Sequence, residues 1–359
     1  MTVMGWLLDA DRSIRWQVMR DLRHDPPEVI AAERARIATE GWGARLLALQ
    51  APDGLWAGNA FSQDRTDTFH VLELLRRLGL DPESEQAHRA IGLVREHVTW
   101  GDGAWWNPPW KDQRFFEGEV EPCINGNVVQ TGSYFGVDMS PLVDRLLGEQ
   151  LADGGWNCEV ENGATVSSFG TTINVLEGLL AHERAINGSD EARAARRRGE
   201  AYMLERRLFR RKSTGDVIDS GWLRFSFPTW WHYDVLRGLD YLRDAGVQPD
   251  DRVAEAIQLV EGKSVRGRPV AAPERPRGRV ALPDGGGRQV QPMDHAPRHA
   301  RTRLVQLTAL TRGYRGISAR RIGAKSSRPP PSIIDVWPPE PRTFVAPPAG
   351  TGDPDDPSR

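Results

Sequence analysis

The chain has 359 residues, which is enough for one large domain or two small ones, and its formal net charge is −2. Its two cysteines exclude a disulfide framework and suit a reducing compartment. No run of about 18 apolar residues is present to cross a bilayer, and the N-terminus lacks the pattern of a signal peptide. We therefore expect a cytoplasmic protein without a transmembrane segment.

Apolar residues at helical spacing predict ten helices in the first three quarters of the chain. They are expected over residues 12–22, 27–49, 67–78, 83–98, 122–135, 141–151, 168–184, 190–209, 231–245 and 250–261. No segment shows the sustained alternation of a half-buried strand, so the predicted fold class is all-α. Taken in pairs, the helices form about five hairpins.

Charge and proline content divide the chain near residue 264. Residues 264–359 hold 17 Lys and Arg against 8 Asp and Glu, and 16 of the 26 prolines, whereas the preceding part holds 30 basic and 41 acidic residues. We predict a folded domain over 1–263 and a disordered tail over 264–359. Such a basic tail could bind nucleic acid. However, codons compatible with residues 265–270 encode a D-G-x-W loop when read one base later, so we favour a frameshift product and expect no nucleic-acid partner.

A loop motif of the form Q-x3-G-x-W recurs between the predicted hairpins. Its two full copies consist of Gln50, Gly54 and Trp56, and of Gln150, Gly154 and Trp156. A degenerate copy ends at Trp105, so the tryptophans are 49 and 51 residues apart. A fixed period of this length marks a repeat architecture. We predict an α/α toroid, an incomplete α6/α6-type barrel of about five hairpins, in which the motif residues are structural.

These motifs resemble those of the terpenoid cyclase and protein prenyltransferase superfamily of α/α toroids. The segments 122–127 and 167–172, each opening an apolar helix, are similar to parts of bacterial squalene-cyclase-like proteins. The resemblance covers about residues 1–262 and implies a protein that binds or converts a prenyl or terpenoid ligand in a central cavity. The only D-x-D-D sequence is at 353–356 in the tail, so class II cyclisation is not supported.

The resemblance also implies a zinc site. Protein prenyltransferases bind zinc through a D-x-C pair and a distant histidine, and Glu121-Pro-Cys123 with His232 is a loose analogue. Cys158, which follows the third tryptophan motif, is a further candidate ligand. Thiolate, imidazole and carboxylate together form a chemically sound zinc set. The alternative is that each buried cysteine is simply a small hydrophobic residue.

Carboxylates near a predicted helix start or just before the aromatic segment that begins at Trp222 are candidate catalytic acids, because proton transfer needs a titratable group at the cavity. The set consists of Asp64, Asp67, Asp216, Asp219 and Asp234. Asp64 and Asp67 stand near His70, which could assist acid–base chemistry, but N-capping of the helix is the favoured interpretation for them.

Aromatic residues concentrate in two segments. The first contains Trp105 and Trp106, and the second contains Trp222, Phe225, Phe227, Trp230, Trp231 and Tyr233. Such rings could line a cavity that holds an isoprenoid or stabilises a cation. They could equally pack the loops between hairpins. Two other functions remain open: a non-catalytic module that binds a lipid or peptide, and an α/α-barrel carbohydrate-active enzyme with two inward carboxylates.

Overall fold

The computed structural model of the chain describes residues 3–57, 67–97, 99–100, 113–226, 228–248 and 250–264. Within these residues the fold is all-α, with two isolated β-bridges, Thr99–Arg114 and Arg210–Val217, and no strand. The sequence-based predictions for Asp64, Trp105, Trp106, Phe227 and the basic tail fall outside the described residues.

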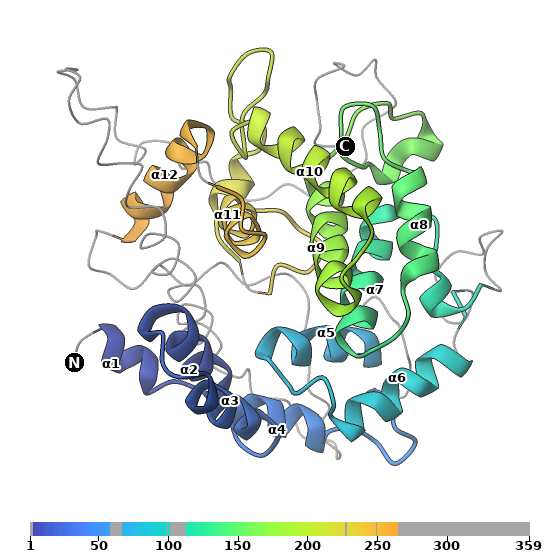
Figure 1. Cartoon of the computed structure of the whole chain (residues 1–359), viewed down its shortest axis with the longest axis vertical. Coiled ribbons are helices and arrows are strands. Elements are labelled where there is room, and N and C mark those ends of the chain that lie inside the picture. Colours follow the sequence, from blue (N-terminus) through green and yellow to red (C-terminus); the bar gives the residue numbers. More distant parts are fainter. Residues whose placement is uncertain are drawn as a thin grey trace, which may run out of the picture.

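The described part contains twelve α-helices (Figure 1). They are α1 (Val3–Leu8), α2 (Arg12–Val18), α3 (Pro27–Ala35), α4 (Gly41–Ala48), α5 (Thr68–Leu78), α6 (Glu85–His97), α7 (Pro122–Tyr134), α8 (Ser140–Gly148), α9 (Phe169–Ile186), α10 (Asp190–Glu205), α11 (Val235–Asp244) and α12 (Ala254–Ser264). A π-helical turn, η1 (Met19–Arg23), extends α2, and five 3₁₀ segments are η2 (Arg36–Ala38), η3 (Phe115–Glu117), η4 (Cys158–Asn162), η5 (Ser220–Leu223) and η6 (Asp251–Val253).

Two predicted helices differ from the observed ones. The helix expected over 27–49 is divided into α3, η2 and α4, because the chain turns at Thr39 and Glu40 and Gly41 has a φ of +72°. The helix expected from residue 231 begins only at Val235, where the side chain of Asp234 accepts the backbone N–H of Arg237. Residues 231–234 therefore form a turn that precedes α11.

The local sequence determines where α5, α7 and α9 begin and where α5 ends. The side chain of Asp67 accepts the N–H of His70 to cap α5, and that of Ser168 accepts the N–H of Thr171 to cap α9. Pro122 occupies the first turn of α7, where its missing N–H is tolerated. Gly79 ends α5 with a φ of +95°.

The helices follow one another around the molecule, from α1–α4 at lower left through α6 and α8 to α12 at upper left (Figure 1). The C-terminal parts of α5, α7 and α9 and most of α11, from Arg237 to Asp244, line one common pocket, together with residues of α2, η1 and α3. These four helices therefore run in the same direction and form the inner layer. Helix α9 is buried on most of its surface, whereas the buried residues of α8 are only Leu142, Val143 and Leu146, as expected for an outer helix.

Helices α7 and α9 approach each other closely at two glycines. A Cβ atom built on Gly126 of α7 would lie 2.5 Å from the carbonyl carbon and oxygen of Asn174. One built on Gly178 of α9 would lie 2.6 Å from the carbonyl oxygen of Gly126. The absence of side chains at both positions thus allows the two backbones to meet.

The two full copies of the loop motif have the same geometry. In the first, Gln50 Nε2 donates to the carbonyl oxygens of Gly54 (2.9 Å) and Gln86 (3.1 Å), and Trp56 Nε1 donates to Leu46 O (2.7 Å). Residues 86 and 46 belong to successive outer helices, α6 and α4. The motif thus joins one outer helix to the next.

The second copy repeats these bonds. Gln150 Nε2 donates to Gly154 O (2.7 Å) and to Ala195 O of α10 (2.8 Å), while Trp156 Nε1 donates to Leu146 O of α8 (2.7 Å). Gly154 has a φ of +99°, which an L side chain rarely adopts. The ring of Trp156 is fully buried. These contacts are structural ties between helices.

The described residues form one main hydrophobic core, and a smaller cluster of Leu7, Ile14, Val18 and Leu22 packs at the N-terminal end. Among the described helices, none combines the length and the apolar character that crossing a membrane requires.

Candidate metal centre

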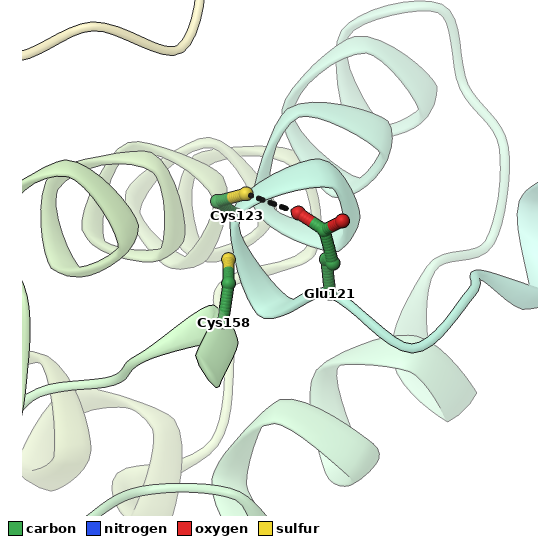
Figure 2. A group of neighbouring side chains, drawn as sticks. All are labelled: Glu121, Cys123 and Cys158. Carbon is green, nitrogen blue, oxygen red and sulfur yellow. Dashed lines mark hydrogen bonds between the residues drawn. The ribbon is translucent and has the colours of Figure 1, made fainter. Parts of the chain in front are cut away.

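Glu121, Cys123 and Cys158 lie together at the N-terminal end of α7. One ligand atom from each lies within 4.8 Å of those of the other two, and all three side chains are partly buried. Figure 2 shows both sulfur atoms and the Glu121 carboxylate directed toward one another, with Cys123 Sγ 3.5 Å from Glu121 Oε2. The two cysteines are 35 positions apart in the sequence, so only the tertiary fold brings them together.

Local structure positions each member of the group. Glu121 is the residue before α7, and Pro122 and Cys123 form the first turn of that helix. Cys158 begins η4, two residues after the buried Trp156. Thr171 in the first turn of α9 supports it, since its hydroxyl donates to Cys158 Sγ (3.2 Å) and accepts the N–H of Cys158 (3.3 Å).

The electrostatics of the group disfavour negative charge. A hydrogen bond with Cys158 and burial raise the pKa of the Cys123 thiol well above its usual range, and the charges of Glu121 and Glu119 add to the effect. Burial, with the neighbouring charge of Glu121, raises the pKa of Glu119 to about 8, although the N–H groups of Val120 and Glu121 donate to its carboxylate. Without a bound cation the Cys123 thiol and the Glu119 carboxyl group therefore favour their protonated forms, and a metal ion would have to displace the thiol proton.

The donor set fits zinc in number and type. Two thiolates and one carboxylate are ligands that zinc accepts, and three protein ligands leave a fourth tetrahedral position open. Sulfur atoms bound to one zinc at about 2.3 Å would lie about 3.7 Å apart. The observed limit of 4.8 Å between ligand atoms needs only a small inward movement of the side chains to reach that geometry.

His232 is not a member of this group. It is exposed in the turn before α11, where its N–H donates to Thr229 O (2.9 Å) and its ring lies 4.8 Å from that of Trp231. The structure thus brings together the two predicted cysteine ligands and Glu121, the carboxylate of the predicted E-x-C pair. The predicted histidine lies on a neighbouring segment.

The described carboxylates of the predicted catalytic set lie at helix starts or on the surface. Asp67 is fully buried and binds its own helix, because its oxygens accept His70 N (3.0 Å) and contact His70 Nδ1 (2.6 Å). Asp234 is likewise buried and accepts the N–H groups of Arg237 and Ser226. Both therefore have the geometry of N-caps.

The two remaining carboxylates, Asp216 and Asp219, are exposed. Asp219 caps η5 by accepting the N–H of Gly221 (2.6 Å), and the N–H of Asp216 bonds to the hydroxyl of Thr214 (3.2 Å). Neither is brought next to Glu121, Cys123 or Cys158.

The second aromatic segment packs mainly inside the protein. Phe169 of α9 contacts Trp222 and Tyr233, with ring centroids 4.9 and 5.0 Å apart, and Tyr233 donates its hydroxyl to Leu208 O. Phe225 and Trp230 are also buried, and the ring of Trp230 meets that of His70 edge-on at 5.4 Å. Trp231 differs, since 40% of its surface is exposed.

A pocket of about 870 Å³ lies at the C-terminal ends of the inner helices. Among the described residues, seven arginines and five Asp or Glu residues line it, and Trp16, Tyr134 and Tyr241 are the aromatic ones. Of the described residues in 222–233, only Thr229 contributes. The described aromatic residues that were predicted to line a cavity do not line this one.

One residue of this region was missed in the sequence. Glu119 is fully buried two positions before Glu121, and the side chain of Asn125 brackets its backbone by accepting Glu119 N (2.8 Å) and donating to Glu119 O (2.7 Å). The available signal in the sequence was the spacing of Glu119, Glu121 and Cys123 at every second position. No family model matches the chain, and no curated protein is significantly similar to it in sequence.

Proposed function

We propose that the chain is a zinc-binding α/α-toroid protein that binds or converts a prenyl or terpenoid substrate. The observation that carries this proposal is the convergence of Glu121, Cys123 and Cys158 at the N-terminal end of an inner helix. The similarity of the loop motifs to those of terpenoid cyclases and prenyltransferases supplies the substrate class.

Zinc at this position would supply a Lewis acid that keeps a coordinated sulfur ionised at neutral pH. Glu121 and the two cysteines would hold the metal. Glu119 keeps a proton on its carboxyl group at neutral pH, because its pKa is about 8, and it thereby limits the negative charge next to Glu121. Thr171 holds Cys158 in place through its hydroxyl.

The substrate would lie at the metal end of the ring. Trp231 is partly exposed, and its backbone oxygen accepts a hydrogen bond from the side-chain amide of Asn174. The same oxygen lies 3.9 Å from a Cβ built on Gly170. Cys158 contacts Thr171 in the same first turn of α9. An apolar, exposed ring on a segment that meets the same first turn of α9 as Cys158 suits an isoprenoid better than the charged pocket does.

Metal analysis of the purified full-length chain tests the first half of the proposal. We expect about one zinc per chain, and we expect Cys123→Ser and Cys158→Ser to lose it while Glu121→Gln weakens it. Glu161→Gln is the matched control, because Glu161 is an exposed carboxylate in η4 close to Cys158 in sequence. Purified protein without stoichiometric zinc, and unable to take it up, would refute the metal site.

Incubation of the zinc-loaded protein with prenyl diphosphates, with and without a thiol acceptor, tests the second half. Mass spectrometry of the products should show a new prenylated or cyclised species that depends on Cys123. An unaltered isoprenoid recovered from the protein would instead favour the non-catalytic binding module. Binding of an oligosaccharide but of no isoprenoid would overturn the proposed substrate class.

A further inference from the structure

The pocket at the C-terminal ends of α5, α7, α9 and α11 is separate from the metal group, which lies at the other end of α7. Cys123 and Ser133 are ten residues apart on one helix, which corresponds to about 15 Å along its axis. The lining residues that the structure describes include seven arginines and five carboxylates. Whether this excess of positive charge indicates a ligand site depends on which arginines already have partners in the protein.

Most of the arginines have local partners. Arg77 pairs with Glu73, Arg237 pairs with Glu177, and Arg243 pairs with Asp240 and Asp244. Arg20 pairs with Asp21. These ion pairs account for four of the seven positive charges.

Two further arginines bond to helix C-termini. Arg34 donates to the carbonyl oxygens of Gly79 and Leu80 at the end of α5, and Arg184 donates to Asp244 O at the end of α11. Such contacts satisfy terminal carbonyls and complement the negative pole of the helix. These arginines are thus structural, like those in the ion pairs.

Arg76 is the exception. Within the described residues its one hydrogen bond is to the side-chain oxygen of Gln130 on α7 (2.8 Å), and its Nε atom is buried without a hydrogen-bond partner. Burial, together with the neighbouring charge of Arg77, lowers the pKa of Arg76 to about 10. The charges of Glu73 and Glu177 offset these effects only in part, so the pocket wall contains an incompletely compensated cation.

A second, independent donor lines the same pocket. Ser133 is 6% exposed and lines the pocket, and its hydroxyl oxygen has no hydrogen-bond partner among the described residues. It stands three positions after Gln130 and so shares that face of α7. The hydroxyl of the next residue, Tyr134, is already engaged by Arg34 and by Leu80 O. A guanidinium N–H and a hydroxyl thus remain available on facing helices.

We propose that this pocket binds a small organic molecule through an oxyanion group, a carboxylate or a phosphate, held by Arg76 and Ser133. Guanidinium groups bind both anions by charge-assisted hydrogen bonds, and Ser133 supplies a neutral donor to the same group. The pocket volume of about 870 Å³ leaves room for the remainder of a metabolite-sized ligand. This site is distinct from the metal group and does not depend on zinc.

The test is a titration of the full-length chain with inorganic phosphate and, separately, with succinate. Sodium chloride keeps the ionic strength constant, and binding is followed by calorimetry and by the thermal unfolding midpoint. We expect saturable binding of at least one anion, an affinity about tenfold lower or worse in Arg76→Met, and a loss of about fivefold in Ser133→Ala. The anion with the higher affinity identifies the ligand group.

Controls separate this site from general charge effects and from the metal site. Arg145→Met removes an arginine that pairs with Glu149 on the outer helix α8 and does not line the pocket, so it should bind the anion normally. Cys123→Ser should lose zinc but retain anion binding. Anion binding that is unchanged in both pocket variants, or no saturable binding in the native chain, would overturn the proposal. Ser133→Ala decides the matter if Arg76→Met does not fold.

Discussion

We predict that glycine-to-alanine substitutions change the free energy of unfolding in opposite directions at two positions, Gly126 in the contact between α7 and α9 and Gly92 in α6. At Gly126 an added Cβ would lie 2.5 Å from two backbone atoms of Asn174 and 2.7 Å from the backbone nitrogen of Val175. Since backbone atoms cannot change rotamer, Gly126→Ala must push the two helices apart. At Gly92, inside the outer helix α6, an added Cβ would have no atom within 4 Å.

The magnitudes follow from these environments. Overpacking of a core typically destabilises by about 1–3 kcal/mol, and a clash with the backbone belongs at the upper end of that range. The higher helix propensity of alanine returns about 1 kcal/mol at each position. We therefore expect Gly126→Ala to lower the free energy of unfolding by about 2 kcal/mol, equivalent to roughly 4–8 °C. Gly92→Ala should raise it by up to about 1 kcal/mol.

Chemical and thermal denaturation of the two variants, measured side by side with the native chain, checks this pair of values. Gly178→Ala should behave like Gly126→Ala, because its added Cβ would lie 2.6 Å from the backbone oxygen of Gly126. If Gly126→Ala instead stabilised the protein as much as Gly92→Ala does, α7 and α9 could not be in the observed contact.

Three further predictions concern buried side chains. The pKa of Glu119 is about 8 against an ordinary value of 4.5, an interval worth up to about 5 kcal/mol, so stability should fall as the pH rises from 4.5 through 8. Glu119→Gln should flatten this fall in unfolding curves recorded across that pH range, and an unchanged slope would contradict the prediction. Trp156→Phe leaves Leu146 O without its donor and should destabilise by about 2–3 kcal/mol in urea denaturation, whereas a loss below 0.5 kcal/mol would argue against the tie. The ion pair with Arg237 lowers the pKa of Glu177 to about 2 despite the burial of this carboxylate, so the ion pair stabilises the fold above pH 4.5 and this stabilisation is lost as the pH falls toward 2. Glu177→Gln should destabilise the protein by about 3–5 kcal/mol at neutral pH and reduce its acid sensitivity. Equal acid sensitivity of the variant and the native chain would count against this assignment.

Much of the fold could be predicted from the sequence because its signals are local. Helical periodicity, the capping role of Asp67 and the stop at Gly79 each depend on a few neighbouring residues, and the structure has all three. The loop motif could be interpreted for a similar reason. Its glutamine and tryptophan bond to the ends of adjacent helices, so its geometry repeats wherever the hairpin repeats.

The sites were less predictable because they depend on which helices meet. The two predicted cysteines converge, since the loop after Trp156 leads back to the first turn of α7. His232 was expected within a helix, but the cap at Asp234 delays α11 and leaves the histidine in an exposed turn. The combination of Arg76 and Ser133 could not be predicted, because each is an ordinary helix-end residue until α5 and α7 pack together.

The common direction of the four inner helices has an electrostatic consequence for the residues at their ends. Each helix C-terminus carries about half a negative charge, so four of them place about two negative charges around a single pocket. The arginines there balance this shared backbone potential as well as their individual carboxylate partners. Charge substitutions at separate helix ends, for example at Arg76 and Arg184, should consequently be non-additive even though the two side chains bond to different residues, Gln130 and Asp244. The pocket thus behaves as one electrostatic unit, and the alignment of the backbone sets its balance as much as any single side chain.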